Sequence, residues 1–204
     1  MDKTIICIGR QYGSGGREIG EAVAMKLGLP CYDKCLIKQA AQEAGLSVQS
    51  VAEYDEKAAD FGFAVSGNPF ADSAALGEAF YSEENQVFDA ERQVILELAK
   101  RGPCVIIGRC ASSILRSAGY RPLSVFVYAD QADRAKRIAA RNHIDEKRAL
   151  HKGQKVDRMR KRHFDFYSDT LWGEPESYDL MLSSSDYTVD GAASVIAAAA
   201  AARR

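Results

Sequence analysis

Short apolar runs alternate along the chain with longer segments in which apolar residues recur every three or four positions. The short runs predict buried strands, and the longer segments predict amphipathic helices. The predicted strands span residues 4–9, 29–32, 104–108, 124–128 and 178–183. The predicted helices span residues 18–27, 34–44, 47–59, 85–100, 131–141, 145–167 and 191–202, the last with Asp190 as its N-cap. Because strands and helices alternate and the strands carry few charges, we expect an α/β fold with a five-stranded parallel sheet covered on both faces.

Composition limits the class of protein. A chain of 204 residues, 47% hydrophobic and 27% charged, is typical of one soluble domain, or of one domain with a mobile subdomain. Residues 62–77 show no period and carry Gly, Ser, Asn and Pro, so we expect a loop or mobile insertion there. No apolar run is long enough to span a bilayer, no signal peptide precedes the first strand, and the five cysteines lack metal-site spacing. We therefore expect a cytoplasmic protein with reduced thiols, no membrane partner and no metal held by a cysteine cluster.

A glycine-rich turn joins the first predicted strand to the first predicted helix. Residues 9–20 read Gly-Arg-Gln-Tyr-Gly-Ser-Gly-Gly-Arg-Glu-Ile-Gly. Glycines let backbone N–H groups curl around an anion, and a helix N-terminus adds the positive end of its dipole. The phosphate-binding pattern G-x-x-x-x-G-K-[ST] requires Lys and a hydroxyl after its last Gly, but here Gly15 is followed by Gly16 and Arg17, and Gly16 by Arg17 and Glu18. The sequence thus predicts a phosphate cradle that lacks its usual lysine.

A dinucleotide-binding turn is the alternative interpretation of the same glycines. Gly13 and Gly15 fit the pattern G-x-G-x-x-G, and Asp33 lies at a suitable distance for the acidic residue that binds a ribose. The third glycine of that pattern is replaced by Glu18. This alternative also leaves the arginine-rich C-terminal half of the chain without a role.

Arginines outside the turn also point to an anionic ligand. Arg109 follows a predicted strand, so it emerges at the edge where open α/β sheets bind ligands, and its planar fork suits phosphate. Residues 134–162 hold twelve Lys or Arg against three acids, whereas residues 43–97 hold twelve acids against two bases. Arg134, Arg137 and Arg141 recur at helical spacing and share one face. Guanidinium groups stabilise the charge of a transferring phosphoryl group, so the cluster favours phosphoryl transfer over a solvated helix surface.

These segments, in this order, resemble the cytidylate kinase-like family of P-loop nucleoside monophosphate kinases. The resemblance rests on residues 8–20, 29–34, 105–111, 157–167 and 172–185. It implies a three-layer P-loop NTPase fold with a helical NMP-binding insertion and a lid. The implied core is 1–33, 84–142 and 176–204, with the insertion at 34–83 and the lid at 143–175. The chain departs from cytidylate kinases at Cys110, where they have Asp, and at Lys34, where they have Ser.

The resemblance also implies roles for individual residues. The donor phosphates of ATP would lie on the turn, and Mg²⁺ would accompany them. Catalysis would use arginines in the turn and the lid, with Arg17 in place of the missing lysine. The acceptor would be bound by an acid after the second strand, by the arginine after the third strand, and by an Asp-x-x-Arg pair in the lid. The donor-binding residues are Gly13, Ser14, Gly15, Gly16, Arg17 and Glu18; the catalytic ones are Arg17, Arg137 and Arg141; the acceptor-binding ones are Asp33, Arg109, Asp157 and Arg160.

The function that the resemblance implies is transfer of the ATP γ-phosphoryl group to CMP, dCMP or a similar small acceptor. Its partner would be a small nucleotide rather than a nucleic acid polymer, and the oligomeric state is left open. Two alternatives remain: a nucleotide-binding sensor or regulatory protein that has lost turnover together with the lysine, and the dinucleotide-dependent oxidoreductase considered above.

Overall fold

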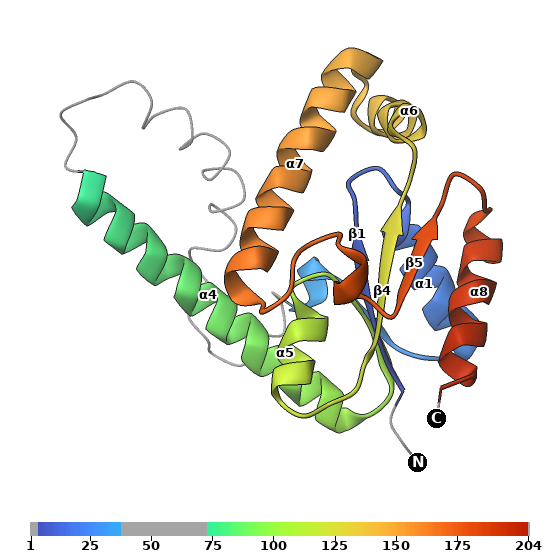
Figure 1. The fold of residues 1–204 in the computed structure, drawn as a ribbon, viewed down its shortest axis with the longest axis horizontal. Coiled ribbons are helices and arrows are strands. Elements are labelled where there is room, and N and C mark those ends of the chain that lie inside the picture. The colour runs from blue at the N-terminus through green and yellow to red at the C-terminus, as the bar shows by residue number, and fades with distance from the viewer. Residues whose placement is uncertain (1–3, 38–72, 204) are drawn as a thin grey trace. The chain divides into compact units, whose positions relative to one another are not determined.

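The computed structural model describes residues 4–37 and 73–203. Figure 1 shows that residues 4–34 and 96–203 form one sheet with helices on both sides of it. The elements are β1 (Ile5–Arg10), α1 (Gly16–Leu27), β2 (Cys31–Tyr32), α4 (Ser73–Arg101), β3 (Cys104–Ile107), α5 (Ala111–Ser117), β4 (Leu123–Tyr128), α6 (Gln131–Asn142), α7 (Glu146–Tyr167), the 3₁₀ helix η1 (Pro175–Ser177), β5 (Leu180–Ser183) and α8 (Val189–Ala201).

The sheet has five strands in the order β2-β3-β1-β4-β5. Every pairing is parallel, so the carboxyl ends of all five strands meet at one edge. β1 lies in the centre, with Ile8 opposite Ile107 of β3 and Val125 of β4. The predicted α/β fold with a five-stranded parallel sheet is confirmed.

The two faces of the sheet bury different sets of side chains. On one face, Ile6, Ile8 and Val127 pack with residues of α1 and α8 in a single apolar cluster. The alternate residues point the other way, as side chains of a strand must. On that second face, the ring of Phe126 lies 5.0 Å from the ring of Trp172, perpendicular to it. The sheet is therefore covered on both faces, as its nearly uncharged strands predicted.

The connections after β1 and β3 run in opposite directions across the sheet. β1 leads through α1 to β2 on one side, and β3 leads through α5 to β4 on the other. Because parallel crossovers are right-handed, α1 and α5 lie on opposite faces of the sheet. Ligands of open α/β sheets bind in the crevice outside the strand ends where such connections diverge. The adjacent ends of β1 and β3 therefore mark the expected binding position.

The chain divides into two compact units. One comprises Met1–Lys34 and Leu96–Arg204, and the other comprises Cys35–Ile95. The first unit contains the whole sheet and every site residue predicted from the sequence. The predicted assignment of core, insertion and lid remains a prediction. The predicted helix at 47–59 and most of that at 34–44 lie outside the described residues, which include helical residues 34–37.

Two predicted boundaries are wrong, and one helix was missed. α4 begins at Ser73, inside the segment predicted as a loop, because the Ala and Leu residues there favour a helix despite the flanking Gly and Ser. α5 was not predicted, since seven residues are too few to show a clear period. The N-cap of α8 is Thr188 rather than Asp190: the Thr188 hydroxyl accepts a hydrogen bond from the Gly191 N–H at 3.0 Å.

Among the described residues, no helix has both the length and the apolar character that crossing a membrane requires.

Candidate functional site

The glycine turn connects β1 to α1 at the centre of the sheet edge. Gly13 and Gly15 have φ of 80° and 75°, a conformation that favours glycine. A Cβ atom on Gly13 would lie 2.8 Å from Cγ1 of Ile138, so only glycine fits beneath α6. A Cβ atom on Gly15 would meet only Nη1 of Arg137, at 3.9 Å. The turn thus has open space at Gly15, next to a guanidinium group and to the uncapped N–H groups at the start of α1.

Serine side chains hold the middle of the turn from inside. Ser14 is fully buried, and its hydroxyl donates to the carbonyl oxygen of Gln11 at 2.9 Å. The hydroxyl of Ser184, at the end of β5, donates to the carbonyl oxygen of Ser14 at 2.5 Å. Ser184 was not predicted from the sequence, where a serine at a strand end carries little signal. These bonds fix the backbone of the turn before any ligand arrives.

The three arginines of α6 all contact the turn or the start of α1. Arg134 Nε donates to the carbonyl oxygen of Tyr12 at 2.8 Å. Arg137 Nη1 lies 3.4 Å from the carbonyl oxygen of Gly13. Arg141 pairs with the carboxylate of Glu18 at 2.5 Å. The prediction that these arginines share one face is confirmed, and that face lies against the turn.

α7 is joined to the turn through the predicted Asp-x-x-Arg pair. The Tyr12 N–H donates to Asp157 at 2.7 Å, and Arg134 forms an ion pair with the same carboxylate. Arg160 donates to the carbonyl oxygen of Arg10 at 2.9 Å, and its guanidinium lies over the ring of Tyr12. Burial raises the pKa of Asp157, although its hydrogen bond to Tyr12 and the neighbouring arginines oppose that rise. The side chains predicted to bind the acceptor therefore also attach α7 to the turn.

Arg17, the predicted substitute for the lysine, lies on the exposed side of α1. Its side chain is 59% exposed and forms ion pairs with Asp33 and Glu21, each at 2.9 Å. Asp33 is the predicted acid after the second strand, and only 13% of its side chain is exposed. The structure thus brings Arg17 and Asp33 together, and both of their predicted roles remain predictions.

The backbone at the end of β3 is strained. Gly108, Arg109 and Cys110 are three successive residues with positive φ, of 80°, 57° and 52°. Such a conformation costs about 1–2 kcal/mol for each residue that is not glycine. Strain of this kind persists only where the surrounding structure enforces it, and it is concentrated at functional sites. The predicted acceptor-binding Arg109 is held in this strained segment.

Sequence reasoning missed Arg10, the last residue of β1. Burial, together with the neighbouring Arg160, Arg109 and Arg17, lowers the pKa of Arg10 to about 9, and Asp33 opposes this shift. The argument that singled out Arg109, an arginine at the carboxyl end of a buried strand, applies equally to Arg10. The two arginines follow adjacent strands of the sheet.

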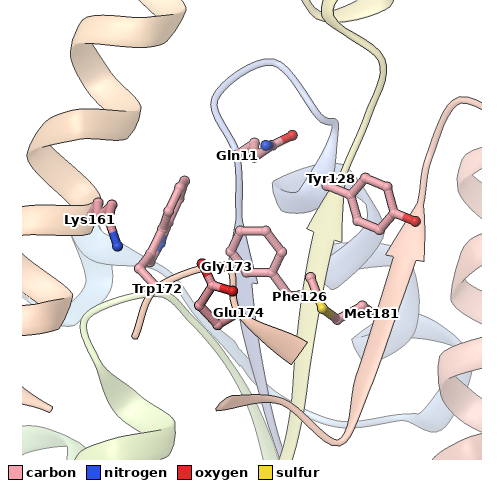
Figure 2. A pocket seen from close by; sticks show the side chains of 8 residues that line it. All are labelled: Gln11, Phe126, Tyr128, Lys161, Trp172, Gly173, Glu174 and Met181. Carbon is pink, nitrogen blue, oxygen red and sulfur yellow. The ribbon is translucent and has the colours of Figure 1, made fainter. Parts of the chain in front are cut away.

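A cavity of about 340 Å³ lies beside the turn, in front of β4 and β5 (Figure 2). Its walls combine flat rings with polar groups at the rim. The lining residues are Gln11, Phe126, Tyr128, Lys161, Trp172, Gly173, Glu174 and Met181. Gln11 belongs both to the turn and to the wall of this cavity, and its side-chain oxygen accepts the N–H of Ala129, just after β4, at 3.2 Å.

The donor atoms of the turn fit a nucleotide-bound magnesium ion better than a protein-held one. Within residues 4–37 and 73–203, no group of three His, Cys, Asp or Glu side chains could hold a metal ion. Mg²⁺ in kinases is usually held by substrate phosphates, water and one or two protein groups. Glu18, whose carboxylate is partly exposed beside Arg141, is the protein group at the turn that could join such a partial shell, whereas the Ser14 hydroxyl is buried and bonded to Gln11.

The sequence model of the cytidylate kinase-like family matches residues 5–186. The chain belongs to this family. A cytidylate kinase of Methanocaldococcus jannaschii is 28% identical over 198 residues, an alignment that covers 96% of each chain. A cytidylate kinase of Methanococcus aeolicus is 32% identical over 120 residues, which cover 57% of this chain and 66% of that protein.

Solved structures of other proteins are similar to this chain in fold. An uncharacterized protein from Eubacterium ventriosum is 26% identical with a TM-score of 0.73, over 98% of this chain and 100% of that one. The shikimate kinase of Bacteroides thetaiotaomicron is 13% identical with a TM-score of 0.53, over 95% and 96% of the two chains, and resembles this chain in fold alone. The family resemblance and the P-loop kinase fold predicted from the sequence are confirmed. This member of the cytidylate kinase-like family is a phosphotransferase.

Proposed function

We propose that the protein is an ATP-dependent nucleoside monophosphate kinase that transfers the γ-phosphoryl group of ATP to CMP or dCMP. One observation carries the proposal. The glycine turn and Arg109 follow the adjacent strands β1 and β3, so both lie at the sheet edge where open α/β sheets bind their ligands. Two phosphorylated ligands bound at these positions would meet end to end.

The donor side of the proposal is supported by the geometry of the turn. The open space at Gly15 lies beside the N-terminus of α1 and the guanidinium of Arg137, a combination suited to the β- and γ-phosphates. Arg137 is anchored by Ser184, whose hydroxyl and carbonyl oxygen accept from it at 3.1 and 3.2 Å. An arginine fixed in this way needs little reorganisation to stabilise charge that develops on the transferring group.

The acceptor side is supported by charge. Arg109 and Arg160 lie near one another, and each is also close to Arg10. A nucleoside monophosphate brings a dianionic phosphate, which would neutralise part of this positive charge. Asp33 and Asp157 are the carboxylates in the same region that could accept hydrogen bonds from a base or a ribose.

In the proposed reaction, an oxygen of the acceptor phosphate forms a bond to the γ-phosphorus of ATP. The bond from that phosphorus to the β–γ bridging oxygen breaks, and ADP leaves with the electron pair. Mg²⁺ bound with the donor phosphates would supply further charge neutralisation. The chain's own contribution is to hold the two ligands in line and to stabilise the negative charge with backbone N–H groups and arginines.

The test is an acceptor panel. The purified protein is incubated with ATP, Mg²⁺ and CMP, dCMP, UMP or AMP in turn, and ADP release is followed. We expect turnover with CMP or dCMP at least about 10-fold faster than with AMP. Faster turnover with AMP would contradict the pyrimidine acceptor. Tight ATP binding without ADP release from any acceptor would instead support a sensor without turnover, and binding of a nicotinamide cofactor would support the oxidoreductase.

A further inference from the structure

Arg10 spans the space between the glycine turn and the strained segment that holds Arg109. A Cβ atom added to Gly16, the first residue of α1, would lie only 2.6 Å from the Cβ atom of Arg10. The guanidinium of Arg10 lies against Gly108. A Cβ atom added to Gly108 would lie 3.0 Å from Cζ of Arg10 and still closer to its Nη1. One side chain thus reaches from the proposed donor position to the proposed acceptor position.

The guanidinium of Arg10 differs from the other arginines around the turn. Arg17, Arg134 and Arg141 each form an ion pair with a carboxylate, and Arg137 is held by Ser184. Within the part of the chain that the structure describes, the Arg10 side chain has no ion pair and no hydrogen bond, and the bond from Arg160 reaches only the backbone carbonyl oxygen of Arg10. A guanidinium carries five N–H donors, so those of Arg10 are available to a ligand.

The charges around Arg10 are predominantly positive. Arg160, Arg109 and Arg17 all disfavour its charged form, and Asp33 is the acid that opposes them. That carboxylate is already paired with Arg17 at 2.9 Å. A buried cation in such surroundings is unfavourable unless an anion joins it. The excess positive charge at the crevice therefore fits a ligand with several negative charges.

We propose that Arg10 binds the phosphoryl group between the donor turn and Arg109 and so takes the place of the missing P-loop lysine. This inference rests on the proposed function for the identity of the two ligands, but not for the binding of phosphate itself. It replaces the prediction for Arg17, whose side chain is mostly exposed and turned towards Glu21 and Asp33. A structural role is the competing explanation, in which Arg10 merely packs against Gly108 and supports the strained segment.

The two explanations predict opposite effects of Arg10→Met, which keeps the apolar stem and removes the charge. If Arg10 binds phosphate, the ligand-free variant melts at a higher temperature than the wild type, by about 3 °C, because repulsion is relieved. If Arg10 is structural, the variant melts at a lower temperature or does not fold. Arg121→Met is the matched control, because Arg121 is exposed and precedes β4 at the opposite edge of the sheet.

The experiment measures melting temperature with and without inorganic pyrophosphate, and kcat with ATP and CMP. We expect pyrophosphate to stabilise the wild type and the control but not Arg10→Met, and kcat of Arg10→Met to fall about 100-fold or more. Arg10→Lys, which keeps the charge, is expected to retain part of both effects. A pyrophosphate shift that survives in Arg10→Met, a kcat within about threefold of wild type, or a variant that fails to fold would overturn the proposal. A wild type that binds pyrophosphate through Arg10 but phosphorylates no acceptor would refute the proposed function and leave this inference standing.

Discussion

The glycine turn after β1 and the arginines at the ends of β1 and β3 lie next to each other but are stabilised differently. Three successive carbonyl oxygens of the turn, those of residues 12–14, accept hydrogen bonds from Arg134 and Arg137 of α6 and from Ser184 after β5. Arg10 and Arg109, by contrast, are close to one another and carry the same charge. Arg109 also has the unfavourable φ of 57°.

This difference separates a preformed part of the site from a part that a ligand completes. A cradle that is already ordered can stabilise the charge of a transition state without reorganising. Repulsion and backbone strain beside it raise the energy of the ligand-free state, and binding of an anion relieves the repulsion. Substitutions in the turn should therefore lower stability, whereas substitutions of the arginines should lower activity with little loss of stability.

The largest effect is expected from Arg109→Met. Removing this guanidinium takes away a group proposed to bind the acceptor phosphate, so kcat/KM for CMP should fall about 1,000-fold. The melting temperature should stay equal to that of the wild type or rise, because a like charge near Arg10 is lost. Steady-state kinetics and thermal unfolding check the two parts, with Arg121→Met as control. An unaltered kcat/KM would contradict the proposed role of Arg109 in binding the acceptor phosphate.

Gly13→Ala tests the preformed turn. A methyl group there must adopt a φ of 80° and lie 2.8 Å from Ile138, so we expect a loss of about 3 kcal/mol in the free energy of unfolding. Gly119→Ala is the matched control: its φ is 83°, but nothing lies within 4 Å of the added atom. The control should lose only about 1 kcal/mol in urea unfolding. Equal losses in the two variants would show that contact with α6 does not constrain the turn.

Asp157→Asn tests the attachment of α7 to the turn. The neutral amide keeps the shape but weakens the bonds from Tyr12 and Arg134, so we expect about 2 kcal/mol less stability. Urea unfolding measures the loss, and Asp186→Asn, an exposed change, should cost nothing measurable. A double-mutant cycle with Arg134→Met should then show coupling, and purely additive losses would contradict the ion pair's role.

The smallest effect is a pH dependence at Arg10. Its pKa is about 9 in the folded protein, well below the ordinary pKa of an arginine, which the unfolded chain retains. Below pH 9 Arg10 is charged in the folded protein, so the destabilisation by this buried charge is fully present. As the pH rises through 9, Arg10 loses its proton in the folded state before it does so in the unfolded state, and the destabilisation therefore decreases. The stability advantage of Arg10→Met over the wild type should therefore shrink by about 1 kcal/mol between about pH 7.5 and about pH 10. An advantage that stays constant over this range would contradict the repulsion.

The sequence predicts the sheet more completely than the site. Short strands rich in Ile and Val, separated by helical segments, predicted a five-stranded parallel sheet, and the structure has one. The shared face of Arg134, Arg137 and Arg141 also follows from helical spacing alone. The short helix α5 and the start of α4 were missed because brief or weakly periodic segments depend on tertiary contacts that spacing does not reveal.

The site could be predicted only in part, because its decisive contacts join residues far apart in the chain. Ser184 meets Ser14 across 170 positions, and Asp157 meets Tyr12 across 145. Which arginine would take the place of the missing lysine depends on the direction of each side chain, and the sequence does not contain that direction. Arg17 follows the glycines directly but turns towards Asp33, whereas Arg10 precedes them and lies against Gly108.

The central claim is that the turn and the arginines together pass a phosphoryl group between two nucleotides. The most direct measurement incubates the protein with ATP labelled in its γ-phosphate, Mg²⁺ and CMP, and follows the label by chromatography. The account predicts that the label appears in CDP, with one ADP formed for each CDP, and that Arg10→Met and Arg109→Met both slow this transfer strongly. Label that remains in ATP, or that appears only as inorganic phosphate, would contradict it.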